Sequence, residues 1–172
     1  MKWQNLGDEQ CSLARTLSVI GDRWTLLVLR EAFLRVRRFE DFQERLGIAR
    51  RVLTERLKHL VDHGVLKKVA YQDAPPRFEY RLTQKGLDLY PVMVGLVHWG
   101  DAHYAGKKGP PLLHRHLTCG HDFRGVLTCS ECGEPVDPRT VQPHVGPGAR
   151  KTLTLLPLER NKSRARSHRR VS

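Results

Sequence analysis

The stretch "RRFEDFQERLGIARRVLTERLKHLVDHG", residues 37–64, decides the fold of this chain. Its first part carries apolar residues at helical spacing and ends at Gly47. Its second part begins after two connecting residues, carries a leucine stripe at the same spacing and ends at Gly64. The two apolar stripes consist of Phe39, Phe42 and Leu46 and of Leu53, Leu57 and Leu60. Two amphipathic helices joined by so short a connection are typical of a helix-turn-helix.

The segments on either side of this pair predict a winged arrangement. Upstream, residues 12–20 have the pattern of a short amphipathic helix, and Asp22 is expected to cap a second helix over residues 23–35. Downstream, residues 65–72 and 77–83 are rich in strand-forming side chains and are separated by "DAPP", which favours a turn. Three helices followed by a hairpin predict a mainly α fold with a small β-wing (α+β), a winged helix-turn-helix.

Residues 84–104 predict a further helix that is apolar on nearly every side. Such a helix needs packing partners on several sides, and a domain of this size offers few of them. We therefore expect this helix to form a subunit interface. Pro91 is expected to kink the helix or to mark its true start.

The composition favours an anionic partner. The formal net charge is +12 and the pI is about 10.1, which suits binding to double-stranded DNA. No apolar run approaches the roughly 20 residues that span a bilayer. The N-terminal "MKWQNLGDEQC" has no apolar signal region, so a cytoplasmic location with reduced thiols is expected.

The second helix of the pair carries the side chains expected to meet DNA. An α-helix fits the major groove, where its N-terminal residues reach the base edges. Charged outer faces are ordinary on amphipathic helices, so this prediction rests on the whole order of elements and on the basic charge. The residues expected to bind DNA are Arg37, Arg38, Arg50, Arg51, Thr54, Glu55, Lys58 and Arg77.

A second constellation, "HLTCGHDFRGVLTCSECGEP" at residues 116–135, has the composition of a metal site. Three thiolates and one imidazole complete a tetrahedral shell for a structural Zn²⁺, and residues 122–128 would form a hairpin that joins the two halves. The expected ligands are Cys119, His121, Cys129 and Cys132, with His116 and His114 competing for the imidazole position. A Cys129–Cys132 redox pair and a knuckle without metal remain open alternatives.

Residues 11–100 resemble the HxlR-type winged-helix regulators of bacteria, which are relatives of the MarR group. The resemblance rests on "CSLARTLSVIGDRWTLLVLREAFLRVRRFEDFQERLGIARRVLTERLKHLVDHGVL" and on "YRLTQKGLDLYPVMVGLVHWG". It implies a homodimeric transcription factor, a repressor by family default, that binds a palindromic operator and responds to a small-molecule effector or an oxidant. It also implies that the homodimer forms through the N-terminal helix and the helix at residues 84–104, which agrees with the apolar character of the latter. Similar C-terminal knuckles in some relatives imply a structural ion. One departure is Ala49, where the family often has a serine that opens the recognition helix.

Cys11 lies at the position of the family's N-terminal cysteine, which senses oxidants or electrophiles in some members. The helix dipole and Arg15 would favour its thiolate, while Asp8 and Glu9 would oppose it. Cys11 is therefore the redox-sensing candidate, and a cysteine that packs at a dimer interface is the alternative.

The predicted organisation has four parts. Residues 1–105 form the winged helix-turn-helix and dimerisation domain, 106–111 a linker, 112–158 the zinc-ribbon-like extension, and 159–172 a disordered basic tail. The chain is not expected to be an enzyme. The rival functions are a thiol-disulfide redox protein or a zinc hydrolase that uses the C-terminal C-x-x-C, and an RNA-binding protein or scaffold that uses the tail.

Overall fold

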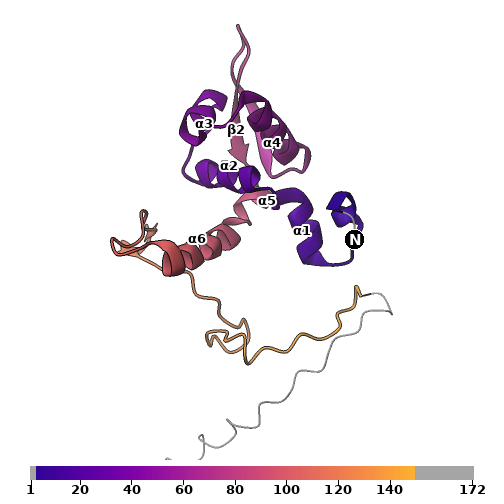
Figure 1. Cartoon of the computed structure of the whole chain (residues 1–172), viewed down its shortest axis with the longest axis vertical. Helices are drawn as coiled ribbons and strands as arrows, with labels where there is room; N and C mark the ends of the chain where they lie inside the picture. The colour runs from indigo at the N-terminus through magenta and orange to yellow at the C-terminus, as the bar shows by residue number, and fades with distance from the viewer. Residues whose placement is uncertain (1–2, 150–172) are drawn as a thin grey trace, which may run out of the picture. The chain divides into compact units, whose positions relative to one another are not determined.

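The structure is a computed structural model that describes residues 3–149, and the chain divides into two compact units after Gly125. Figure 1 shows the first unit as a group of helices from which a β-hairpin projects. Its elements are a 3-10 helix (Trp3–Asp8), α1 (Ser12–Ile20), α2 (Arg23–Phe33), α3 (Phe39–Leu46), α4 (Arg50–Asp62), β1 (Leu66–Gln72), β2 (Arg77–Leu82), α5 (Gln84–Leu87), α6 (Tyr90–Tyr104), β3 (Arg115–His116) and β4 (His121–Asp122). This order confirms the predicted mainly α fold with a small β-wing.

The helix ends follow the local signals in the sequence. The Asp22 carboxylate accepts hydrogen bonds from the backbone N–H groups of Trp24 (2.9 Å) and Thr25 (3.1 Å), as expected for the cap of α2. Gly47 adopts φ +58° after α3, a left-handed conformation that favours glycine. α2 ends at Phe33, two residues before the predicted end.

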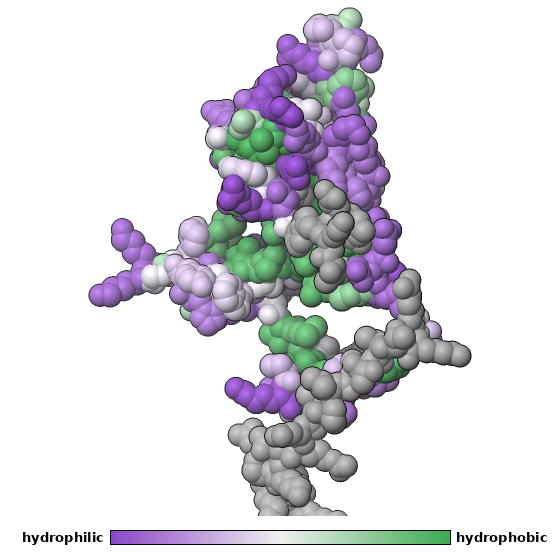
Figure 2. Space-filling model, turned by 45° about the vertical axis from the view of Figure 1, so that its right-hand side comes forward, coloured by the Kyte–Doolittle hydropathy of each residue, from purple (hydrophilic) through white to green (hydrophobic). Residues whose placement is uncertain are grey.

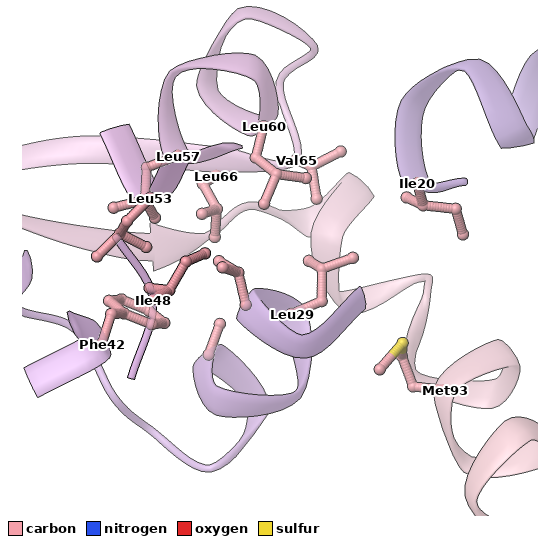
Figure 3. Close-up of a cluster of buried hydrophobic side chains, with 12 residues drawn as sticks. Ile20, Leu29, Phe42, Ile48, Leu53, Leu57, Leu60, Val65, Leu66 and Met93 are labelled. Carbon is pink, nitrogen blue, oxygen red and sulfur yellow. The ribbon is translucent and has the colours of Figure 1, made fainter. Parts of the chain in front are cut away.

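The core of the first unit lies between α2, α3, α4 and the first residues of β1. The α4 leucines, Leu53, Leu57 and Leu60, are all 0% exposed. They belong to one cluster of buried side chains with Ile48 and Phe42, which Figure 3 shows. Burying each leucine contributes about 1.5–3 kcal/mol relative to leaving it in water. The predicted leucine stripe is therefore the face that fixes α4 on the domain.

The β-hairpin is tied to the helix pair by backbone contacts. β1 and β2 pair antiparallel, from Leu66 opposite Leu82 to Gln72 opposite Arg77. The segment before α3 forms a bridge with β2, because the N–H of Tyr80 donates to the carbonyl of Arg37 at 2.8 Å. These contacts hold the wing beside the N-terminal ends of α3 and α4.

The prediction of one helix over residues 84–104 was wrong, because α5 and α6 are separate helices. The hydroxyl of Thr83 caps α5 by accepting from the N–H of Gly86 at 3.1 Å. Pro91 lies in the first turn of α6, where its missing N–H has no helical partner to lose. The expectation that Pro91 marks the true helix start is confirmed.

The expected hairpin over residues 122–128 was also wrong. Its first residue belongs to β4, which pairs with β3 in the first unit. Its last residue, Thr128, forms a bridge with Pro135 in the second unit. Two separate small hairpins are therefore present. The predicted tail at 159–172 lies outside the described residues. Among those residues, no helix has both the length and the apolar character to cross a membrane.

Candidate nucleic-acid interface

α4 presents a polar outer face opposite its buried leucines. Of the predicted DNA-binding residues, those on this helix are Arg50, Arg51, Thr54, Glu55 and Lys58, and all are exposed. Arg37, Arg38 and Arg77 are exposed as well. The structure thus leaves all eight predicted side chains accessible to a large ligand.

Two cations on the outer face of α4 form weak ion pairs with carboxylates one helical turn away. Arg51 Nε lies 3.0 Å from Glu55 Oε1, and the Arg51 side chain is 90% exposed. Lys58 pairs in the same way with Asp62, one helical turn on. Exposed pairs of this kind contribute about 0–1 kcal/mol, so a phosphate can displace the carboxylate at little cost. Ala49 begins the helix without a side-chain cap, as the sequence predicts.

Between the ends of α3 and α4 and the wing lies a hollow of about 500 Å³. Arg38, Arg50 and Arg77 line it together with Lys68, which the sequence analysis did not select. Glu40 and Asp41 also line the hollow, so its charge is mixed rather than purely basic. The structure therefore brings three of the eight predicted residues to one concave surface.

Three of these cations rest on aromatic rings. The Arg50 guanidinium lies 4.7 Å from the centre of the Phe39 ring, and that of Arg38 lies 4.9 Å from the centre of the Tyr71 ring. The Lys68 ammonium lies 3.9 Å from the centre of the Phe78 ring. Such contacts contribute about 0.5–1 kcal/mol at exposed sites. They hold the charges in place without neutralising them.

Tyr80 lies deeper in the same hollow. Burial raises the pKa of its phenol, and the Glu40 carboxylate raises it further. Tyr80 therefore stays neutral and can offer a hydrogen bond to an anion. Lys68 was missed because its role depends on strand alternation, which places it opposite Tyr80 in the hairpin.

Large apolar side chains remain exposed on α1 and α6. Leu13 of α1 is 66% exposed, and on α6 Trp99 is 58% and Tyr104 75% exposed. Figure 2 shows hydrophilic residues over much of the surface around the wing, and hydrophobic residues gathered on the side of the first unit away from it. The predicted dimer surface is thus apolar and open.

Cys11 is exposed and occupies the N-cap position of α1, where its side chain makes no capping hydrogen bond. The Arg15 guanidinium donates to the backbone carbonyl of Glu9 at 2.6 Å. The thiol is therefore accessible to a dissolved oxidant.

The predicted metal ligands lie on the two small hairpins. In the first unit, Cys119 Sγ lies 3.3 Å from Nδ1 of His116, and His121 is exposed on β4. In the second unit, hydrogen bonds from the backbone of Cys132 and of Glu131 hold the pKa of the Cys129 thiol below its usual value. Within residues 3–149, no group of three or more His, Cys, Asp or Glu is placed to hold a metal ion. The zinc site remains a prediction.

Comparisons with known proteins agree with the fold. The sequence profile of the family described as HxlR-like helix-turn-helix matches residues 19–108. An HTH-type transcriptional regulator of Mycobacterium tuberculosis is 46% identical over 142 residues, which cover 83% of this chain and 90% of the relative. That match extends well beyond the region of the family profile. The regulator YdeP of Bacillus subtilis is 33% identical over 96 residues, 55% of this chain and 75% of YdeP.

Solved structures show the same likeness. The crystal structure of PA1607, a proposed transcription factor, is similar at a TM-score of 0.73 and 32% identity, over 80% of this chain and 96% of that one. The redox regulator HypR in its oxidized form is similar at a TM-score of 0.51 and 31% identity, over 54% of this chain and 97% of HypR.

Proposed function

This chain belongs to the HxlR-like helix-turn-helix family of transcriptional regulators, and we propose that it is a cytoplasmic repressor that binds a palindromic operator as a homodimer. The observation that carries the proposal is that α4 is amphipathic, with one face buried and the other exposed. Its leucines are fully buried, and its outer face offers two arginines at the N-terminal end, where a recognition helix meets the bases.

In this proposal the hollow beside the wing takes up the DNA backbone. Arg38, Lys68 and Arg77 are exposed cations around it, and positively charged side chains bind phosphates with strong dependence on salt. Backbone contacts fix the register of the protein on the duplex, whereas the α4 side chains read the sequence.

The test is binding to the DNA upstream of the protein's own gene, measured by fluorescence anisotropy. The double variant Arg50→Ala, Arg51→Ala is expected to weaken binding at least about 30-fold, because a good arginine contact to a base contributes about 1–3 kcal/mol. The matched control is Arg124→Ala, Arg139→Ala, which removes the same charge from exposed positions outside the helix pair. Equal affinity of the α4 variant and the wild type would overturn the assignment.

Dimerisation is supported by the apolar side chains on α1 and α6. Trp99→Asp places a charge in this surface and is expected to yield monomers in light scattering. A wild-type protein that is monomeric, or a footprint on the operator without two-fold symmetry, would contradict the homodimer.

Redox control through Cys11 is a second part of the proposal. Its thiol is exposed, and HypR, a structurally similar protein, is a redox regulator. A mild thiol oxidant is expected to change operator affinity in the wild type and not in Cys11→Ser. An unchanged response in the variant would assign sensing to other cysteines.

A further inference from the structure

Another hollow, the α1–α2–α4 hollow, has a volume of about 490 Å³. It is lined by the end of α1, the start of α2 and the second half of α4, and by none of the eight predicted DNA-binding residues. His59 joins two of its walls, because its Nε2 donates to the carbonyl of Val19 at 3.0 Å. The volume falls within the range of about 300–1,000 Å³ that is usual for small-molecule sites.

Two buried polar atoms of residues that line this hollow have no hydrogen-bond partner within residues 3–149. They are the hydroxyl oxygen of Thr25, a residue that is 0% exposed, and the Nε of Arg56. Buried polar groups are normally paired, because an unpaired one destabilises the folded chain. A ligand that offers an acceptor to both atoms would remove this penalty.

The Arg56 guanidinium is loosely held. Its Nη1 lies 3.8 Å from Asp22 Oδ1 and its Nη2 lies 3.8 Å from Glu55 Oε2, and both distances exceed the length of a hydrogen bond. The side chain is 28% exposed, so it can turn toward a molecule in the hollow. A planar guanidinium forms two parallel hydrogen bonds with a carboxylate, which makes a carboxylate the best-matched ligand group.

The lining of the hollow favours a monoanion with a hydrocarbon body. Arg23 and Arg56 are the arginines among the lining residues, and Asp22 is the carboxylate. Asp22 repels a doubly charged phosphate more strongly than a singly charged carboxylate. Leu17 and Val19 add apolar surface, against which a hydrocarbon group is stabilised by leaving water.

Arg56 also connects the hollow to the outer face of α4. One oxygen of Glu55 lies 3.8 Å from Arg56, and the other lies 3.0 Å from the Nε of Arg51. A ligand that engages Arg56 leaves Glu55 to pair with Arg51 alone. Arg51 is then less available to DNA.

We propose that the α1–α2–α4 hollow is an effector site for a small organic carboxylate, which pairs with Arg56, accepts a hydrogen bond from Thr25 and weakens operator binding. The effect on the operator rests on the function proposed above. Binding of the carboxylate by the free protein does not, so the two can be tested separately.

Isothermal titration calorimetry of the full-length protein with acetate, hexanoate and benzoate tests the site. We expect binding of at least one of them, and binding at least about 10-fold weaker for the corresponding neutral amide, which lacks the charge that Arg56 pairs. Arg56→Gln should weaken carboxylate binding at least about 10-fold for the same reason. The matched control is Arg124→Gln, at an exposed position that does not line the hollow, and it should leave the affinity unchanged.

Thr25→Val separates a ligand contact from a structural role. It removes a buried hydroxyl that has no partner, so the melting temperature should stay equal or rise, while carboxylate affinity should fall about 3–10-fold. A threonine that serves only packing would leave the affinity unchanged. This variant also keeps the test decisive if Arg56→Gln does not fold.

Three results would overturn the site: no binding of any of the three carboxylates, equal binding of inorganic phosphate, or full affinity in both variants. Operator binding, measured by anisotropy with and without saturating carboxylate, tests the coupling. We expect it to weaken about 5-fold or more, the usual range for coupled sites. Unchanged operator affinity would overturn the regulatory role. A protein that binds the carboxylate but no operator would contradict the proposed function instead.

Discussion

The winged helix and the two small hairpins are stabilised in different ways. In the first, Leu53, Leu57 and Leu60 are fully excluded from water and pack with α2 and α3. In the hairpins at residues 114–136, no residue is buried, and order comes from backbone hydrogen bonds around two glycine turns. A difference of this kind predicts that the same type of substitution has unequal effects in the two regions.

Truncation of a buried leucine has the largest expected effect. Leu57→Ala should lower the free energy of unfolding by about 2–5 kcal/mol, because it leaves a cavity among fully buried neighbours. Urea unfolding followed by circular dichroism at 222 nm measures it. Leu127→Ala, at a hairpin residue that is 74% exposed, should change this value by less than about 0.5 kcal/mol. Equal losses would mean that the hairpins share the apolar core.

Removal of a buried charge has the second largest expected effect on stability. The Glu31 carboxylate is 3% exposed and accepts hydrogen bonds from Arg30, its neighbour on α2, and from Arg45, which links α2 to α3. Burial acts to raise the pKa of Glu31, but the bonds from Arg45 and Arg30 outweigh it and hold that pKa below its usual 4.5. Glu31→Gln should therefore lose about 1–3 kcal/mol at neutral pH.

The same carboxylate gives this effect a pH dependence. A lowered pKa means that stabilisation by Glu31 is present above about pH 4.5 and is lost as acid protonates the folded state. The difference between wild type and Glu31→Gln should shrink below that pH in unfolding titrations. Glu131→Gln, at an exposed hairpin carboxylate, is the control and should show no such difference. If the stability difference between wild type and Glu31→Gln grew in acid, the lowered pKa of Glu31 would be contradicted.

Loss of a helix cap has the smallest expected effect. Asp22→Ala should lower stability by about 1 kcal/mol, because two N–H groups at the start of α2 lose their acceptor. Asp137→Ala removes a carboxylate that accepts from the N–H of Arg139 in a turn of the second unit. It should leave unfolding of the winged helix unchanged. Thermal melts of both variants measure the contrast.

Much of the fold could be predicted because its signals are local. Apolar spacing indicated α3 and α4, Asp22 marked the start of α2, and glycine marked the ends of α3 and α4. The exposed residues of α4 followed from the same periodicity, since a helix that buries one face must expose the other. The break between α5 and α6 was missed, although Pro91 signalled the start of α6.

Other parts of the site depend on distant segments. Lys68 reaches the hollow only because β1 and β2 pair in one register and lie beside α3. The choice between His116 and His121 could not be made from spacing, because both lie within reach of Cys119 along the chain. In the structure the two histidines lie opposite each other on β3 and β4, and the His116 ring lies against the Cys119 sulfur.

The sequence by itself therefore determined the element order and the buried face of α4, since both follow from side-chain type and period. Tertiary structure decided which cations share a hollow and which histidine ring lies against the Cys119 sulfur. Both depend on strand pairing, which joins residues whose separation along the chain carries no information about their distance in space.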